Sequence, residues 1–414
     1  MWESKGKRQD ETNVFFNYNG DNKYTPRALL IDLEPGVISD IKSKTNHLFH
    51  DRNIHVSQTG LGAGNIWTKG YDYADNNVEI FLDMLDKELD SCDNLEAFQL
   101  IHSVGGGTGS GVGSYLLEIL SDRYNKKLTT TWSIFPGNSS DVVIQPYNTI
   151  LTLKRLCENS DANIVIENSA LMKIALNTLQ TNSPTIEQTN QFISTIMSSS
   201  TNTLRFPKYS YNSLTSIIST LIPTPDLHFI QPSYSQYTSD FVEDVKFFKK
   251  SSSLEVLISL LDRSNKFIET NDRYQKYISI FNILQGDYDQ LDIQKSIIRT
   301  QQRASFVPWS SSSVHIAQGE KSKYYQTLNS NYPNGLMLSN SSSIITLLEK
   351  SCKEFDKLFK KRAFAKNYLG KLVENEVVEF EDSRSSVQRI IDEYKNAELI
   401  SYLDDDDDDE DVDI

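Results

Sequence analysis

Hydrophobic and polar positions alternate in short blocks along the first half of the chain. Apolar runs of strand length lie at 28–31, 54–57, 98–104, 128–135 and 164–166. Runs with helical spacing lie at 74–90, 112–120 and 146–159. This alternation predicts an α/β fold with a doubly wound parallel sheet, in which ligands bind outside the carboxyl ends of the strands. The loops expected to converge there begin at Asp32, Gly62, Gly105, Pro136 and Asn168.

The second half is more mixed. We expect a long helix from Ser183 to about residue 203 and strands at 228–230, 277–284 and 314–317. Two amphipathic helices, at 344–360 and around 387–394, predict a helical hairpin. Ordinary core packing explains its apolar faces, and exposure of one face to a partner is the alternative. The expected domains are 1–182, a core helix at 183–206, an intermediate α/β domain at 207–340, the hairpin at 341–398 and a disordered acidic tail at 399–414.

The stretch Gly105 to Gly111 reads GGGTGSG and lies between a predicted strand and a predicted helix. Glycines let a phosphate approach the backbone, and a helix N-terminus after a strand presents N–H groups to an anion. Thr108 and Ser110 add hydroxyl groups. The run has neither the terminal Lys of a P-loop nor the G-x-G-x-x-G spacing, so its own N–H groups, the helix dipole and a metal must balance phosphate charge. A flexible turn is the alternative interpretation.

Composition narrows the class of protein. The chain of 414 residues has a net charge of −15, and nine carboxylates between Asp404 and Asp413 supply more than half of it. This balance argues against nucleic acid as a ligand. Cys92, Cys157 and Cys352 are far apart, which favours a reducing compartment without a zinc site. His102 falls inside an apolar strand, so we interpret it as a core residue. The sequence shows neither a signal peptide nor a membrane-spanning apolar run, which predicts a cytosolic or nuclear protein.

The glycine loop and several further motifs resemble the tubulin family, and the later ones resemble its γ branch. These motifs are IDLEP at 31–35, GAGNIW at 62–67, QPYNTILTLKRL at 145–156, STIMSSST at 194–201, LIPTPDLHF at 221–229, YISIFNILQGD at 277–287 and FDKLFKKRAF at 355–364. The similarity runs from about Val14 to Ala397, and SYLD at 401–404 resembles yeast-type members. It implies a tubulin-like fold that binds GTP or GDP with Mg²⁺.

The resemblance assigns roles position by position. The implied phosphate contacts come from Ser103, Gly105, Gly106, Gly107, Thr108, Gly109, Ser110 and Gly111. Ala63, Gly64 and Asn65 would approach the γ-phosphate, and Asp32 and Glu34 would hold the magnesium shell through water. Asp141 and Gln145 would face the ribose. Asn168 and Asn190 would recognise the guanine edge, and Ile186 stands where the family stacks an aromatic ring on the base.

Other positions depart from the family pattern. Ser216 replaces the carboxylate with which α-tubulin completes hydrolysis of its neighbour's nucleotide, and Tyr211 and Ser213 replace family Asn and Asp. Nothing before Val14 resembles the family's first strand and phosphate loop. We expect the start at Met1 to reflect an incomplete sequence rather than a working variant, because loss of that central strand would leave its two neighbours unpaired. A complete chain of this kind would have impaired nucleotide binding.

The implied function is structural, with at most slow GTP hydrolysis. A γ-tubulin-like subunit would nucleate microtubules at the microtubule-organising centre or spindle pole body, on its cytoplasmic or nuclear face. Its implied partners are carrier proteins of the γ-tubulin complex, α/β-tubulin dimers and lateral γ-tubulin neighbours, without nucleic acid or membrane insertion. The alternatives are a polymer-forming α- or β-type tubulin and a nucleotide-dependent enzyme such as a dehydrogenase. The tail is either a solubilising end or a regulatory handle with phosphorylation at Ser401 and Tyr402.

Overall fold

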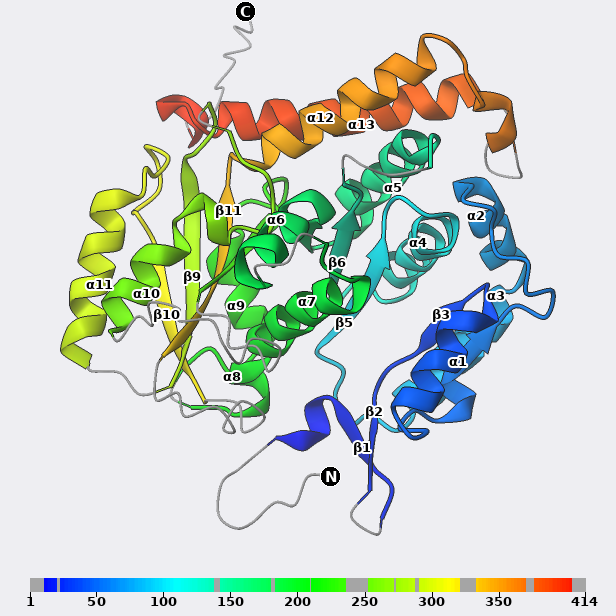
Figure 1. Ribbon diagram of the computed structural model, residues 1–414, viewed down its shortest axis with the longest axis horizontal. Helices are drawn as coiled ribbons and strands as arrows, with labels where there is room; N and C mark the ends of the chain where they lie inside the picture. The colour runs from blue at the N-terminus through cyan, green and yellow to red at the C-terminus, as the bar shows by residue number, and fades with distance from the viewer. Residues whose placement is uncertain are drawn as a thin grey trace, which may run out of the picture.

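A single large sheet forms the centre of the computed structural model, with helices packed around it and a helical pair across one end (Figure 1). The structure describes residues 11–20, 23–137, 142–179, 183–208, 210–235, 252–271, 273–286, 290–320, 333–369 and 376–403. The seven strands have the order β10-β9-β11-β8-β7-β6-β5. This arrangement confirms the expected α/β class.

The strands on the glycine-loop side of the sheet are parallel, and the far side is mixed. The parallel neighbours are β5 (Ala97–Ser103), β6 (Leu128–Phe135), β7 (Ala162–Glu167) and β8 (Phe229–Ser235). β11 (Asn334–Ser341) runs antiparallel between β8 and β9 (Tyr277–Gln285). β10 (Val314–Gly319) pairs parallel with β9. Every side chain of β7, β8 and β9 is buried, as expected for strands covered on both faces.

Two small sheets lie apart from the large one. β1 (Phe16–Tyr18) and β2 (Tyr24–Pro26) form an antiparallel hairpin in a region where the sequence showed no element. β3 (Leu30–Asp32) and β4 (Ile54–Val56) pair parallel with each other. The prediction of one shared sheet is therefore wrong for β3 and β4.

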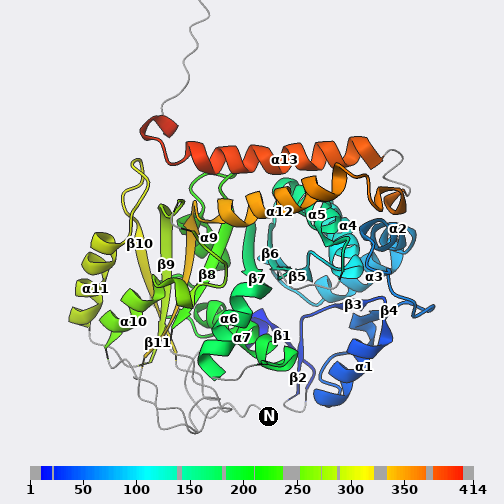
Figure 2. The same cartoon turned by 45° about the horizontal axis from the view of Figure 1, so that its top comes forward.

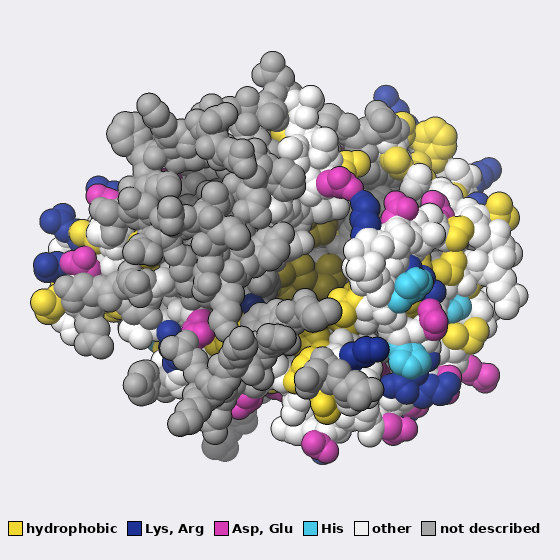
Figure 3. All heavy atoms as spheres, turned by 60° about the horizontal axis from the view of Figure 1, so that its bottom comes forward, with side chains coloured by type: hydrophobic (Ala, Val, Ile, Leu, Met, Phe, Trp, Pro, Cys, Tyr) yellow, Lys and Arg dark blue, Asp and Glu magenta, His cyan; other side chains and the backbone are white. Residues whose placement is uncertain are grey.

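The edge of the large sheet at β5 is open among the described residues. Figure 2 shows β3 and β4 to the side of β5, and the sheet order ends at β5. Ile101 on this strand is 56% exposed. On the face opposite the helical pair, Figure 3 shows hydrophobic side chains within a central hollow. An edge strand of this kind leaves backbone N–H and C=O groups without a ladder partner.

The helices of the first half are α1 (Pro35–Lys44), α2 (Trp67–Asn76), α3 (Val78–Leu89), α4 (Gly113–Arg123), α5 (Gln145–Asn159) and α6 (Asn168–Leu179). The single helix predicted at 74–90 is in fact two, with the break at Asn77. Pro35 occupies the first turn of α1, where its missing N–H costs nothing.

The helices of the second half are α7 (Ile186–Ser200), α8 (Asn202–Arg205), α9 (Leu214–Leu221), α10 (Ser253–Leu260), α11 (Gln290–Arg303), α12 (Ile344–Phe359) and α13 (Glu376–Asn396). The predicted core helix begins later than Ser183, because the side chain of Thr185 caps it in a capping box with Gln188. It is also interrupted at Thr201, which lies between the end of α7 and the start of α8.

The predicted hairpin is present, with α12 and α13 running side by side over α5 (Figures 1 and 2). Its contact with α5 is aromatic: the rings of Tyr147 and Phe380 stack with centroids 4.8 Å apart, and Phe355 meets Tyr147 edge-on. All three side chains are fully buried. The interpretation of the apolar faces as core packing is confirmed. No described helix has the length and apolarity needed to cross a bilayer.

The segment after α13 corrects the expected start of the tail. Ile400–Leu403 forms a 3₁₀ turn, and Tyr402 stacks on Trp309 with ring centroids 5.1 Å apart. The Tyr402 hydroxyl donates a 2.6 Å hydrogen bond to Glu393. Residues 399–403 are therefore not disordered. The acidic residues 404–414 lie outside the described part of the chain.

Candidate functional site

The glycine loop leaves β5 and coils directly into α4. Thr108–Val112 forms a single π-helical turn that continues into Gly113. The hydroxyl of Ser110 donates to the carbonyl oxygen of Gly106, and Ser103 Oγ accepts a 3.4 Å hydrogen bond from the Gly105 amide. The two hydroxyl groups thus hold the turn rather than pointing away from it. Irregular turns of this type are frequent at functional sites.

The glycines of the loop differ in what surrounds them. A side chain at Gly107 would place its Cβ 2.7 Å from Ala63 Cβ and 2.8 Å from the Ile66 amide nitrogen. At Gly109 it would lie 2.7 Å from the Ser103 carbonyl oxygen. Gly106, by contrast, faces open space within 4 Å. The loop therefore closes against the protein on one side and leaves one glycine accessible, which is the shape required for a bound anion.

The Ala63–Asn65 loop is held against the glycine loop by one buried amide. Asn148 on α5 donates through Nδ2 to the carbonyl oxygens of Asn65 at 2.8 Å and Gly105 at 2.9 Å. Its Oδ1 accepts from the Trp67 amide at 3.1 Å and from the Tyr368 hydroxyl at 2.7 Å. Asn148 is fully buried, and these contacts use both sides of its amide. The structure thus brings together two of the predicted phosphate segments.

Positive backbone angles shape that second loop. Gly62, Gly64 and Asn65 have φ values of 64°, 57° and 59°. Asparagine tolerates this left-handed conformation better than other side chains do. The loop then passes directly into α2, whose Trp67 is fully buried.

Helix α2 packs backbone to backbone on the π turn. A Cβ on Gly70 would collide with the Gly107 carbonyl oxygen, and one on Gly111 would collide with the Trp67 carbonyl oxygen. The close approach requires glycine at both positions. A shift of α2 must consequently move the glycine loop as well.

His102 supports the loop from beneath and is the core residue that the sequence predicted. The carbonyl oxygen of Gly109 can only accept, so His102 Nδ1 donates to it at 3.0 Å, and Nε2 accepts from Ser133 Oγ at 2.9 Å. Burial lowers the pKa of His102 from 6.5 to about 4. The imidazole is therefore neutral at physiological pH.

The two carboxylates expected around a metal lie at the end of β3 and at the N-cap of α1. Asp32 Oδ1 accepts hydrogen bonds from the amides of Leu33 at 2.7 Å and Glu34 at 3.4 Å. Glu34 is exposed, and its carboxylate lies against Gly62, where a Cβ would displace it. Among the described residues no group of three or more His, Cys, Asp or Glu side chains could enclose a metal ion. A cation here would depend on phosphate oxygens and water for its other ligands.

The residues expected around the nucleoside are only partly joined to this site. Gln145 begins α5, and its Nε2 would lie 3.3 Å from a Cβ on Gly105. Asn168 begins α6 beside Gly137, at the carboxyl ends of β6 and β7. Asp141 lies outside the described residues.

Ile186 and Asn190 lie one turn apart at the start of α7, and both are exposed. Within the described part of the chain, no hydrogen bond joins either side chain to the glycine loop. Ile186 is 78% exposed. An ion pair of 2.5 Å between Lys44 and Glu187 brings the end of α1 to this turn.

An ion pair with a fully buried carboxylate connects the end of β7 to α12. Glu167, the last residue of β7, is fully buried and precedes Asn168. Its Oε1 accepts from Lys350 Nζ at 2.6 Å and from Ser169 Oγ at 2.7 Å, and its Oε2 accepts from the Glu269 amide at 2.9 Å. The start of α6 is thereby fixed to the C-terminal helices.

Sequence reasoning missed Asn148, although it lies within a quoted motif. Asn148, Thr152 and Arg155 recur at spacings of four and three, so they share one face of α5. All three are buried, and the remainder of the helix is also largely apolar and buried. A polar stripe on a helix without an exposed face was the signal that could have revealed it, because buried polar groups need partners.

Comparison with known proteins adds to this geometry. The family model of the Tubulin/FtsZ family GTPase domain matches residues 1–176, and that of the tubulin C-terminal domain matches residues 225–353. A tubulin gamma chain from Eremothecium gossypii is 49% identical over 399 residues, which cover 96% of this chain and 85% of that protein. The chain belongs to the γ-tubulin family.

Two further relatives in this family support the assignment. Tubulin gamma chains from Candida glabrata and Saccharomyces cerevisiae are 46% and 45% identical, over 96% and 97% of this chain and 86% of each relative. The resemblance to γ-tubulin is thus confirmed, and the dehydrogenase alternative is excluded.

Proposed function

We propose that this γ-tubulin-family chain binds GTP or GDP at the loops that converge around Gly106. The supporting observation is the Asn148 amide, which fastens the Ala63–Asn65 loop and the glycine loop to each other while Gly106 stays open. At Gly107 and Gly109 the surrounding protein leaves no room for a side chain. Backbone N–H groups and the N-terminal end of the π turn are therefore what the loop offers to phosphate oxygens. The match to a GTPase domain over residues 1–176 supports guanine nucleotide as the ligand.

The proposal extends to the metal and the base. Asp32 and Glu34 would hold Mg²⁺ through water: Glu34 lies against Gly62, and Asp32 holds the turn that leads to Glu34. Gln145 and Asp141 would contact the ribose. Asn168 and Asn190 would hydrogen-bond the guanine, and the exposed Ile186 would cover its face with an aliphatic contact.

The role of the bound nucleotide is structural in this proposal. Ser213 caps α9 by accepting a 3.2 Å hydrogen bond from the Ser216 amide, and Tyr211 hydrogen-bonds His315 at 2.7 Å. These side chains stabilise the start of α9 and supply no carboxylate for a neighbouring nucleotide. The chain would act as a nucleating subunit that contacts carrier proteins, lateral copies and α/β-tubulin at a microtubule-organising centre, in the cytoplasm or at the nuclear face of the spindle pole body.

The test is equilibrium binding of fluorescent GTP to the full chain in the presence of Mg²⁺, with GDP, GTP and ATP as competitors. We expect GTP and GDP to compete and ATP to fail, because the two amides match the guanine edge. Competition by ATP at equal strength, or an absence of binding, would contradict the nucleotide site. Nucleation is tested separately, by whether the chain with its carrier complex shortens the lag of microtubule assembly without entering the microtubule wall.

A further inference from the structure

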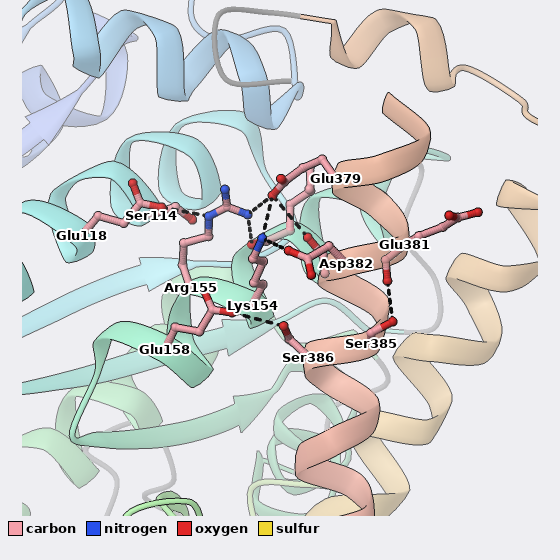
Figure 4. Close-up of polar contacts among 12 residues, drawn as sticks. Ser114, Glu118, Lys154, Arg155, Glu158, Glu379, Glu381, Asp382, Ser385 and Ser386 are labelled. Atoms are coloured by element: carbon pink, nitrogen blue, oxygen red, sulfur yellow. Dashed lines mark hydrogen bonds and ion pairs between the residues drawn. The ribbon is translucent and has the colours of Figure 1, made fainter. Parts of the chain in front are cut away.

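Four helices meet at one buried guanidinium group, that of Arg155 on α5 (Figure 4). Its side chain is 4% exposed, and it pairs with a carboxylate on each side. Nε lies 3.0 Å from Glu118 on α4, and Nη1 lies 2.6 Å from Glu379 on α13. The guanidinium carbon also lies 4.8 Å from the centre of the Trp67 ring on α2. None of these residues belongs to the proposed nucleotide contacts.

On the side of Glu118, the Arg155 network holds α2. Glu118 uses its second oxygen to accept a 2.5 Å hydrogen bond from the Tyr71 hydroxyl, and Tyr71 stacks on Trp67 with ring centroids 4.7 Å apart. The indole of Trp67 donates a 3.0 Å hydrogen bond to Ser114 on α4. The first turn of α2 is thus fixed both to α4 and to the Arg155 guanidinium.

On the side of Glu379, the Arg155 network holds α13. Glu379 also pairs with Lys154 at 3.4 Å, and Lys154 pairs with Asp382 one turn further along α13. A separate contact joins the same two helices: Ser386 donates to Glu158 at 3.1 Å and does not involve Arg155. The α5–α13 interface therefore has polar contacts that belong to the Arg155 network and a polar contact, Glu158 with Ser386, that lies outside it.

The first turn of α2 is also where the two phosphate loops meet. Trp67 follows Asn65 and Ile66 directly in sequence, and Gly70 and Gly111 press α2 onto the π turn of the glycine loop. Close-packed backbone cannot yield by itself, so a change at one loop is passed to the other and to α2. Arg155 is the side chain that continues this chain of contacts to α13.

We infer that Arg155 and Glu379 are positioning residues that fix the Ala63–Asn65 loop for a terminal phosphate and couple the nucleotide state to α13. This inference rests on the proposed nucleotide function. The pair contacts no proposed ligand group, and so its effect must pass through Trp67 and α2. GTP has the γ-phosphate that this loop would meet and GDP lacks it, so the two nucleotides should respond differently when the pair is broken.

If the Arg155–Glu379 pair only stabilised the fold, breaking it would affect GTP and GDP binding equally. A buried ion pair is often no more stabilising than a well-packed apolar substitute, whereas removal of one partner leaves the other charge buried and unpaired. Loss of stability alone would therefore not distinguish the roles. The ratio of GTP affinity to GDP affinity does, because a uniform loosening of the fold weakens both nucleotides equally.

The experiment compares Glu379→Gln with Glu158→Gln in the full chain. Each variant removes one carboxylate charge at the α5–α13 interface, and only the first belongs to the Arg155 network. We expect Glu379→Gln to weaken GTP binding about fivefold and to change GDP binding less than twofold, within the range by which network positions modulate coupling. Glu158→Gln should leave the affinity for both nucleotides unchanged.

A thermal unfolding curve of each variant accompanies the titrations. If Glu379→Gln unfolds at the assay temperature, Glu379→Asp takes its place, since it keeps the charge but draws it away from Nη1. Equal GTP-to-GDP ratios in parent and variant, with binding intact, would overturn the coupling and leave the proposed nucleotide site in place. A parent chain that binds neither nucleotide would overturn both.

Discussion

The hydroxyl of Tyr368 donates a 2.7 Å hydrogen bond to the side-chain oxygen of Asn148. Tyr368 belongs to the 3₁₀ turn after α12, and both residues are fully buried. Asn148 in turn holds the carbonyl oxygens of Asn65 and Gly105. The segment that connects the two C-terminal helices is therefore in contact with the residue that assembles the phosphate loops.

Replacement of Asn148 by alanine should separate the two loops. It removes the donor from the buried carbonyl oxygen of Gly105 and from the part-buried one of Asn65, and leaves the Tyr368 hydroxyl only its 3.2 Å bond to the Ile144 carbonyl oxygen, at about 1–3 kcal/mol for each unsatisfied buried group. We expect a loss of about 3 kcal/mol in the free energy of unfolding, measured by urea denaturation, and loss of GTP binding.

The matched control is Asn77→Ala. The Asn77 amide donates a 2.7 Å hydrogen bond to the Tyr73 carbonyl oxygen at the end of α2 and is half-buried. This variant should lose less than about 1 kcal/mol and keep its nucleotide affinity. A similar loss in the free energy of unfolding for both variants would show that Asn148 has no special role in holding the two loops together.

Gly106 and Gly107 should respond differently to alanine. At Gly107 the new methyl group would meet Ala63 and the Ile66 amide, so Gly107→Ala should reduce both stability and nucleotide binding. At Gly106 nothing lies within 4 Å of the new methyl group. Gly106→Ala should therefore keep the unfolding midpoint, while its methyl group blocks the approach of a phosphate. Thermal unfolding and GTP titration of the two variants provide the measurement. An unchanged GTP affinity in Gly106→Ala would place the phosphate elsewhere.

Lys350→Met should be costly because its partner is deeply buried. Glu167 would keep its charge while losing the 2.6 Å contact to the ammonium group, and breaking such a pair costs about 3–5 kcal/mol. Glu167 keeps its hydrogen bonds from Ser169 and the Glu269 amide, which reduce that cost. We therefore expect the free energy of unfolding, measured in urea, to fall by about 2–3 kcal/mol. The control Lys353→Met removes an exposed pair with Glu349 and should cost less than about 0.5 kcal/mol. Equal costs would mean that the buried position of Glu167 is unimportant.

His102 predicts a loss of stability on acidification. Its pKa in the folded chain is about 4, below the ordinary 6.5 that the unfolded chain should show, so the unfolded state binds the proton first. The stability is complete above about pH 6.5 and falls as the pH drops towards 4, by about 3 kcal/mol in total. Urea midpoints at pH 7, 6 and 5 measure it.

The variant His102→Gln isolates this contribution, because glutamine has no proton to gain in that range. Burial also lowers the pKa of His228, which adds a dependence of the same sign in both proteins. The slope of stability against pH should therefore be shallower in His102→Gln than in the parent. Identical slopes would count against a neutral, buried imidazole at position 102.

The sequence predicted best where apolar residues dominate an element. β6 spans Leu128–Phe135 as expected, and α12 differs from its predicted range by one residue. β11, with the sequence NGLMLSNS, was missed because its Asn and Ser residues resemble a loop. It is nevertheless fully buried, since Asn340 donates to the Leu221 carbonyl oxygen at 3.1 Å and Ser339 to that of Gln231 at 3.2 Å. Those acceptors are remote in sequence, so local pattern could not reveal them.

In the candidate site, too, local sequence features could be predicted and contacts between remote residues could not. The glycine loop was recognisable because its composition is unusual for any other purpose, and His102 because it interrupts an apolar strand. The bridge from Asn148 to Asn65 joins residues 83 positions apart, and the pair of Arg155 with Glu379 spans 224. Partners of this kind depend on how helices pack, which the spacing of residues within one helix does not specify.

The β7–β8 junction has a consequence for how the molecule comes apart. Two residue pairs, Asn163 with Phe229 and Ile164 with Ile230, join the glycine-loop side of the sheet to its far side. One continuous apolar cluster also includes Val104, Leu227 and Ile345 from three separate regions of the chain. Because this cluster draws on several regions of the chain, those regions should unfold together rather than one at a time. A ligand seated at the glycine loop would then protect remote parts of the same cluster, such as α12 and α13, from proteolysis without touching them.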